Sequence, residues 1–223
     1  MKITYPTSLE DITLNQYCTY LEMLNDLDKN QSNTEFVYLK TLEIFCGITY
    51  EQAMNIEYAD VLQIVEDIKI VLEQKPDLKD NLFFKVGKLE FGFITNVDKL
   101  KWGAFLDLNN NIGKWENMHI AMGVLFRPVV KKNRKGLYVV EEYKGDTYHD
   151  AIKEMPMSAV IGAMVFFWNL GIDCTTYIAK YLEVEAGKMN LVQQLNLVES
   201  GVGIQQLTNS LEVILQGMKI SQT

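Results

Sequence analysis

The stretch LFFKVGKLEFGFI, residues 82–94, decides the fold class, because the sequence changes there from a helical to a strand-like pattern. Two short runs rich in aromatic and β-branched residues flank Val86, Gly87 and Lys88, which is typical of a β-hairpin. A second hairpin is predicted in RPVVKKNRKGLYVVEEY, residues 127–143. Helical patterns precede, separate and follow the two hairpins. We therefore expect an α+β fold that is predominantly α-helical.

The region before the first hairpin, residues 1–80, is predicted to be acidic and helical. It contains six lysines and fifteen aspartates or glutamates, a net charge of −9. Thr13 and Thr49 are each followed three residues later by a glutamine, the capping-box pattern of a helix start, and Gly47 is of the type found just past a helix end. The last helix of the region, residues 57–75, should bury one apolar stripe. This stripe is expected to comprise Val61, Leu62, Val65, Ile68, Val71 and Leu72.

The middle region, residues 81–186, is expected to form an α+β core around the two hairpins. Helices are predicted in KLKWGAFLDL, residues 99–108, and in WENMHIAMGVLF, residues 115–126. Asp146 is expected to cap the N-terminus of a further helix, because an aspartate at that position accepts hydrogen bonds from free backbone amides.

The longest predicted helix follows Pro156 and runs to about Glu185. Its segment AVIGAMVFFWNLGI, residues 159–172, is almost entirely apolar. A helix needs about twenty residues to cross a bilayer, so a buried central helix is favoured over a membrane span. The N-terminal sequence MKITYPTSLEDIT lacks the apolar run of a signal peptide.

Residues 187–223 are predicted to form an amphipathic helical arm. Apolar residues at helical spacing form two stripes, separated by a break at Gly201 and Gly203. These stripes must be covered, either within the same chain or by the groove of a partner. We expect the interface with a partner or with a second copy of the chain to include Leu191, Leu195, Val198, Leu207, Leu211, Ile214 and Leu215.

The net charge of −8 argues against general nucleic-acid binding, because such binding depends on cationic contacts to phosphates. The turn of the second hairpin is basic and is an alternative phosphate-binding site. Cations on an exposed hairpin also keep the strands of different molecules apart, and we favour that interpretation. The basic turn consists of Lys131, Lys132, Arg134 and Lys135.

The three cysteines, Cys18, Cys46 and Cys174, lie far apart in the sequence and form no C-x-x-C pair. This spacing argues against a disulfide framework or a zinc site and favours a reducing compartment. Cys46 and Cys174 occur in apolar helical runs, where a thiol is expected to be buried and unreactive.

Glu116 and His119, three positions apart on a predicted helix, are the strongest candidate for a metal site. Such a pair forms half of a carboxylate-bridged di-iron site. The other half would have to come from Asp146 and His149, but aspartate replaces glutamate there and Asp146 is better used as a cap. The sequence contains no glycine-rich phosphate loop, no G-x-S-x-G and no H-E-x-x-H motif. We therefore expect a non-enzymatic protein without metal or cofactor, with a metal-dependent enzyme using Glu116 and His119 as the distant alternative.

Four stretches of the sequence carry a family resemblance: PTSLEDITLNQYCTYLEM, TLEIFCGIT, FGFITNVDKLKWGAFLDLNNNIGKWENMHIAMGVLFRPVV and EMPMSAVIGAMVFFWNLG. In this order they resemble a family encoded in the structural gene modules of tailed phages of Bacteroidota, including crAss-like and related phages. The resemblance covers residues 6–175, and WENMHIAMGVLFRP with the preceding FLDL is its most specific part. The chain departs from the family at residues 102–105, WGAF, where a more polar stretch is expected, and at Phe126, where tyrosine is usual.

The resemblance implies a role in virion morphogenesis through protein–protein contacts, as a factor similar to a tail-assembly chaperone. The alternative is a resident minor virion protein of the tail connector or the capsid interior. The partners would be other phage structural or assembly proteins, and the location would be the host cytoplasm during assembly, or the virion. Glu116 and His119 would then belong to a helix-loop surface anchored by Trp115 and Arg127.

Overall fold

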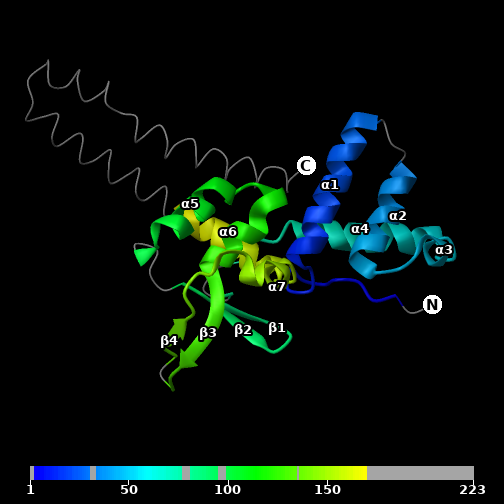
Figure 1. The fold of residues 1–223 in the computed structure, drawn as a ribbon. Helices are drawn as coiled ribbons and strands as arrows, with labels where there is room; N and C mark the ends of the chain where they lie inside the picture. Colours follow the sequence, from blue (N-terminus) through cyan, green and yellow to red (C-terminus); the bar gives the residue numbers. More distant parts are fainter. Residues whose placement is uncertain (1–2, 31–33, 77–80, 95–98, 135, 170–223) are drawn as a thin grey trace, which may run out of the picture. The chain divides into compact units, whose positions relative to one another are not determined.

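The computed structural model divides into two compact units, residues 1–162 and 163–223. The elements labelled in Figure 1 belong to the first unit. The structure describes residues 3–30, 34–76, 81–94, 99–134 and 136–169.

Four helices precede the sheet, and local signals fix their ends. Thr13 Oγ1 accepts a hydrogen bond from Gln16 N (3.2 Å), and Gln16 Oε1 accepts one from Thr13 N (2.9 Å). The same reciprocal pair forms between Thr49 and Gln52, so both predicted capping boxes are confirmed. Gly47, with φ of 64°, follows the end of the second helix as predicted. The helices are α1 (Leu14–Asn30), α2 (Thr34–Cys46), α3 (Tyr50–Ala53) and α4 (Tyr58–Leu72).

The buried stripe of α4 differs from the prediction at one position. Leu62 was expected in the stripe but is 37% exposed, whereas Ile64 is buried. Each residue turns a helix by about 100°, which takes Leu62 to the flank of the stripe and Ile64 to its core side. The helix also ends at Leu72 rather than at residue 75. The other predicted members of the stripe are buried: Val61, Val65, Ile68, Val71 and Leu72.

Both predicted hairpins form, and they join into one antiparallel sheet with the strand order β1-β2-β3-β4. Gly87, with φ of 56°, lies in the turn of the first hairpin. The hairpins meet between β2 and β3, where Gly92 pairs with Arg127 and Phe93 pairs with Phe126. The sequence predicted the hairpins but not this pairing between them. The strands are β1 (Phe83–Val86), β2 (Leu89–Phe93), β3 (Phe126–Lys132) and β4 (Tyr138–Val140).

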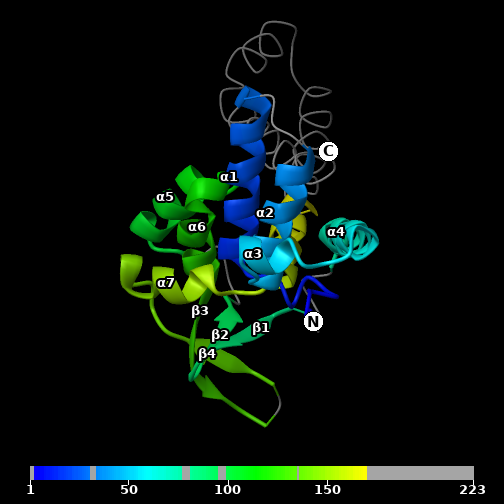
Figure 2. The same cartoon turned by 90° about the vertical axis from the view of Figure 1, so that its right-hand side faces the viewer.

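Helix α6 lies at the centre of the hydrophobic core and continues directly into β3. Helices α5, α6 and α7 gather on the same side of the sheet (Figures 1 and 2), which confirms a helix-rich α+β fold. The fully buried side chains of α6 are Met118, Ala121, Met122, Val124 and Leu125. The elements here are α5 (Trp102–Asn111), the 3-10 helix η3 (Trp115–Asn117), α6 (Met118–Leu125), the 3-10 helix η4 (Gly145–Tyr148) and α7 (His149–Lys153).

The predicted helix cap at Asp146 is wrong. Asp146 lies inside η4, and α7 begins only at His149, with Tyr148 at its N-cap position and no side-chain capping bond. Gly145 adopts a φ of 65° and starts the 3-10 turn one residue earlier. The aspartate therefore enters the turn instead of flanking a helix.

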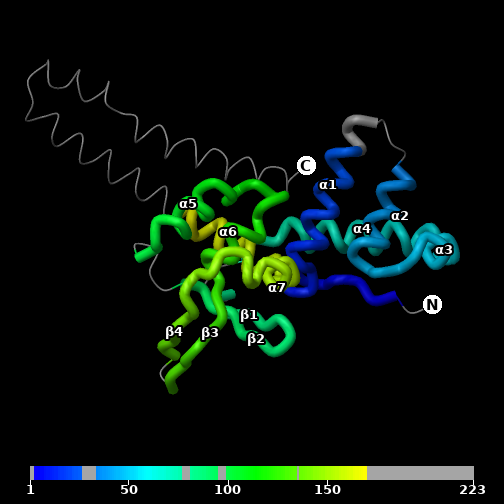
Figure 3. Tube along the Cα trace, in the orientation of Figure 1, coloured from blue at the N-terminus to red at the C-terminus, as the bar shows by residue number. Residues whose placement is uncertain are grey.

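The start of α1 is tied to the start of the last described helix, residues 157–169. Leu14 N donates a hydrogen bond to Met155 O (2.9 Å), and Met157 N donates one to Ile12 O (2.8 Å). Figure 3 shows the start of α1 beside α7, which immediately precedes this helix. Backbone hydrogen bonds thus join two segments from opposite ends of the first unit.

The remaining predictions for the C-terminal region lie outside the described residues. They are the continuation of the long helix to Glu185 and the arm at residues 187–223 with its expected interface positions. Among the helices that the structure describes, none combines the length and apolar composition of a bilayer span.

Candidate functional site

The two histidines of the chain lie against each other. His119 comes from α6 and His149 from the first position of α7, and their ring centroids are 5.2 Å apart with the planes at 83°. Gly123 of α6 lies beside this contact, since a Cβ atom there would be at van der Waals distance, 3.5 Å, from His149 Cδ2. The pair therefore depends on the close packing of α7 on α6.

The surroundings of His119 favour its neutral imidazole. Burial lowers the pKa of His119, and the nearby charges of His149 and Lys153 lower it further, against a smaller opposing effect of Asp150. His149 Nε2 is buried and has no hydrogen-bond partner among the described residues. Protonation of His119 would thus cost solvation and place its charge near that of Lys153.

The carboxylates considered for a metal site do not complete one with these histidines. Glu116 is exposed on η3, and Asp146 is exposed in η4. In the described part of the chain, no three His, Cys, Asp or Glu side chains come together in a group that could hold a metal ion. What the structure assembles is a pair of imidazoles at a helix–helix contact.

Two of the cysteines are half-buried thiols. Cys18 Sγ donates a hydrogen bond to Trp115 O (3.1 Å), and burial, followed by the charges of Glu22 and Glu116, raises the pKa of Cys18 to about 12. Burial also raises the pKa of Cys46 to about 11. Both side chains are therefore protonated at neutral pH and are poor nucleophiles. Cys174 lies outside the described residues.

Trp115 and Arg127 hold the two ends of the segment that contains α6. The Trp115 ring packs edge-on against Tyr17 of α1, with 4.7 Å between the ring centroids. Arg127 Nε donates to Val124 O (2.8 Å), and its guanidinium carbon lies 5.6 Å from the centroid of the Tyr143 ring. These contacts connect η3 to the N-terminal helices and β3 to the segment after β4.

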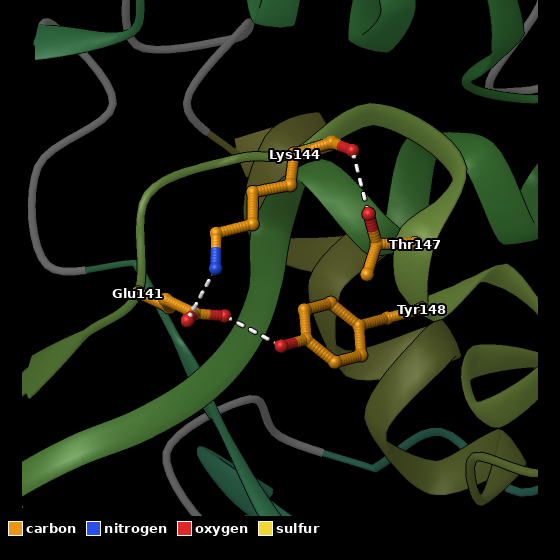
Figure 4. Close-up of polar contacts among 4 residues, drawn as sticks. All are labelled: Glu141, Lys144, Thr147 and Tyr148. Carbon is orange, nitrogen blue, oxygen red and sulfur yellow. Dashed lines mark hydrogen bonds and ion pairs between the residues drawn. The ribbon is translucent and has the colours of Figure 1, made fainter.

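The segment between β4 and α7 is fixed by a polar cluster, shown in Figure 4. Glu141 accepts hydrogen bonds from Lys144 Nζ and from the Tyr148 hydroxyl, both at 2.6 Å. The bond from Lys144, followed by that from Tyr148, lowers the pKa of Glu141, and the bond to Glu141 raises the pKa of Tyr148. Thr147 Oγ1 donates to Lys144 O (2.9 Å). Each of these polar groups has a partner within the cluster. We therefore interpret the cluster as a structural feature that fixes this segment.

An exposed apolar surface on α5, which we call the α5 patch, consists of Trp102, Phe105 and Leu106. Trp102 is 71% exposed, and its ring stacks on Phe105 with centroids 5.5 Å apart. We did not predict this surface from the sequence. The sequence contains Trp102 and Phe105 at helical spacing, but such spacing is more typical of a buried helix face.

A second exposed surface, which we call the hairpin surface, combines apolar and basic residues of the β3–β4 hairpin. Val130, Leu137 and Val139 are each at least 60% exposed, and Lys131 and Arg134 are exposed beside them. Lys132 is engaged elsewhere, because its Nζ lies 3.9 Å from the centroid of the Phe83 ring and 3.5 Å from Glu90 Oε1. Lys135, the fourth residue of the predicted basic turn, lies outside the described residues.

Comparison with known proteins does not assign the chain to a family. No protein-family model, no curated protein and no solved structure matches it. The function must therefore be argued from the histidine pair, the polar cluster and the two exposed surfaces.

Proposed function

We propose that the protein is a non-enzymatic assembly factor of tailed phages, similar to a tail-assembly chaperone, which acts by binding other virion proteins. The α5 patch is the observation that carries the proposal. Its stacked Trp102 and Phe105 are open to solvent. Phe105 begins the FLDL stretch of the phage resemblance, and Trp102 lies just before it, where this chain departs from the family pattern.

The α5 patch has the chemistry of a binding hot spot. Tryptophan is among the residues most enriched where truncation to alanine costs about 2 kcal/mol or more of binding free energy. Its ring buries a large area at a low cost in conformational entropy, because it has only two rotatable side-chain bonds. Stacking on Phe105 fixes the ring before a partner arrives, so less freedom is lost on binding.

The proposal is tested by affinity purification of the tagged full chain from phage-infected cells, followed by mass spectrometry. We expect virion proteins to be recovered with the wild-type chain and their recovery to fall at least about tenfold with Trp102→Ala or Phe105→Ala, which corresponds to a loss of about 1.4 kcal/mol. Phe36→Ala on α2 is the matched control, because Phe36 is 46% exposed and Phe105 is 44% exposed. Recovery of no virion protein, or equal recovery with Phe105→Ala and Phe36→Ala, would refute the proposal.

Purified phage particles distinguish the chaperone from the resident virion protein. A chaperone is absent from finished particles, whereas a tail-connector or capsid-interior subunit is present in a fixed number of copies. Quantitative mass spectrometry of particles, compared with lysate from the same infection, gives this ratio directly.

A further inference from the structure

The apolar side chains of the hairpin surface point to solvent instead of the core. The register between β3 and β4 shifts between Val129 and Lys131, so Val130 is the extra residue of a β-bulge. A bulge redirects a side chain, and Val130 is accordingly exposed next to Leu137 and Val139. Strand β4 is at the end of the strand order and pairs with β3 alone among the described strands.

The charged residues of the hairpin surface are all basic. Residues 130–139, VKKNRKGLYV, contain four basic residues and no acidic residue. Lys132 is paired with Glu90, whereas no ion pair of Lys131 or Arg134 is found among the described residues. An apolar surface with free cations around it fits a partner surface that is both apolar and acidic.

The chain carries a surface of that kind on α3 and the start of α4. Tyr50, Met54 and Tyr58 follow one another at intervals of four and are each at least 60% exposed. Residues 50–60, YEQAMNIEYAD, contain three acidic residues and no basic residue. We call this the acidic surface, which consists of Tyr50, Glu51, Met54, Glu57, Tyr58 and Asp60.

We propose that the hairpin surface of one copy of the chain docks on the acidic surface of a second copy. The two surfaces match in charge and both expose large apolar side chains. In Figures 1 and 2 the β3–β4 hairpin points away from α3, so the contact forms between molecules. This inference goes beyond the proposed function and does not depend on it.

The geometry of such a contact has a consequence for the assembly. The two surfaces are different, so each copy that uses its hairpin surface still offers a free acidic surface to another copy. Head-to-tail contacts of this type produce closed rings or open filaments rather than a two-fold symmetric dimer. Opposite charges also make the association weaken as salt screens them.

The test uses two full-length variants, each with one surface altered. The hairpin variant, Arg134→Glu with Leu137→Glu, reverses charge and removes an exposed apolar side chain. The acidic-surface variant, Glu51→Lys with Met54→Lys, does the same on the other side. All four positions are exposed, so thermal unfolding followed by circular dichroism should remain cooperative in both variants.

Sedimentation velocity of the purified chains, at equal concentration, supplies the readout. We expect the wild type to sediment as a species of several chains, and each variant alone to sediment as a single chain. An equimolar mixture of the variants should form a two-chain species and nothing larger, because only one intact surface remains on each. An isologous dimer or an unrelated interface would not be restored in this way.

Several results would overturn the inference. They are a wild-type chain that stays monomeric, a variant that keeps the wild-type size, and a mixture of folded variants that stays monomeric. If a double variant loses its cooperative transition, the single changes Lys131→Glu and Glu51→Lys carry the same comparison. Because only the purified chain is measured, a negative result here leaves the binding of phage proteins to be judged by its own experiment.

Discussion

Replacing Phe126 by alanine should destabilise the core severely, because this ring lies where α6 becomes β3. Phe126 is 1% exposed, and its centroid is 5.3 Å from those of Phe84 and Phe93. Truncating a buried phenylalanine costs about 3–5 kcal/mol, which is a large share of the roughly 5–15 kcal/mol that stabilise a typical protein. At about 1.4 kcal/mol per factor of ten, the unfolding constant should rise roughly a hundred- to several thousand-fold.

Urea unfolding followed by far-ultraviolet circular dichroism measures this change. With a slope of about 2–3 kcal/mol per molar urea, the midpoint should fall by about 1–2.5 M. Phe105→Ala is the control, because it removes the same ring from a position that is 44% exposed, and it should cost no more than about 1 kcal/mol. Equal midpoint shifts for the two variants would show that the Phe126 cluster does not hold the core together.

Three other substitutions test local features. Thr13→Ala removes the oxygen that accepts from Gln16 N and should cost about 1 kcal/mol in urea unfolding; an unchanged midpoint would mean that the capping box contributes nothing. Because burial lowers the pKa of His119 in the folded state, the unfolded chain binds more protons below about pH 6.5, so the thermal midpoint should fall as the pH drops from about 7 to 5. His119→Gln should make that fall less steep, and an identical pH dependence would contradict the lowered pKa of His119 in the folded chain. Glu116→Gln, on an exposed residue, should change the unfolding free energy by less than about 0.5 kcal/mol, and a larger loss would reveal a contact of this carboxylate that matters for folding.

The features that were predicted correctly have their causes close together in the sequence. A capping box needs only a threonine and the glutamine three residues later, so both starts, at Thr13 and Thr49, were found. A tight hairpin needs two strand-forming runs around a glycine such as Gly87. In each case the stabilising contact forms within a few residues of chain, and the local pattern is sufficient.

The features that were missed depend on contacts between residues far apart in the sequence, or on the conformation of a single residue. The joining of the hairpins places Phe93 opposite Phe126, and nothing in either hairpin identifies the other as its neighbour. The histidine pair likewise needs α7 to pack at Gly123 of α6. Asp146 failed as a cap because a single glycine before it began a 3-10 turn.

The candidate surfaces were predicted less well than the fold. The basic turn was found as a group of charges, but its exposed apolar members Val130 and Val139 follow from a bulge that the sequence does not reveal. The α5 patch was visible only as Trp102 and Phe105 at helical spacing. Exposure is a property of the whole packing arrangement, and a tryptophan at helical spacing normally indicates a core face.

The backbone hydrogen bonds that join Ile12 to Met157 and Leu14 to Met155 affect the order in which the chain folds during its synthesis on the ribosome. About 140 residues separate the two segments, so at a rate of roughly 5–20 residues per second the first waits roughly 7–30 s for its partner to be synthesised. During that interval the nascent N-terminal helices have their caps but lack the strand-like bridge between Thr13 and Pro156. Completion of the first unit is therefore a late event in translation, set by the emergence of residues 155–157 rather than by the helices that were made first.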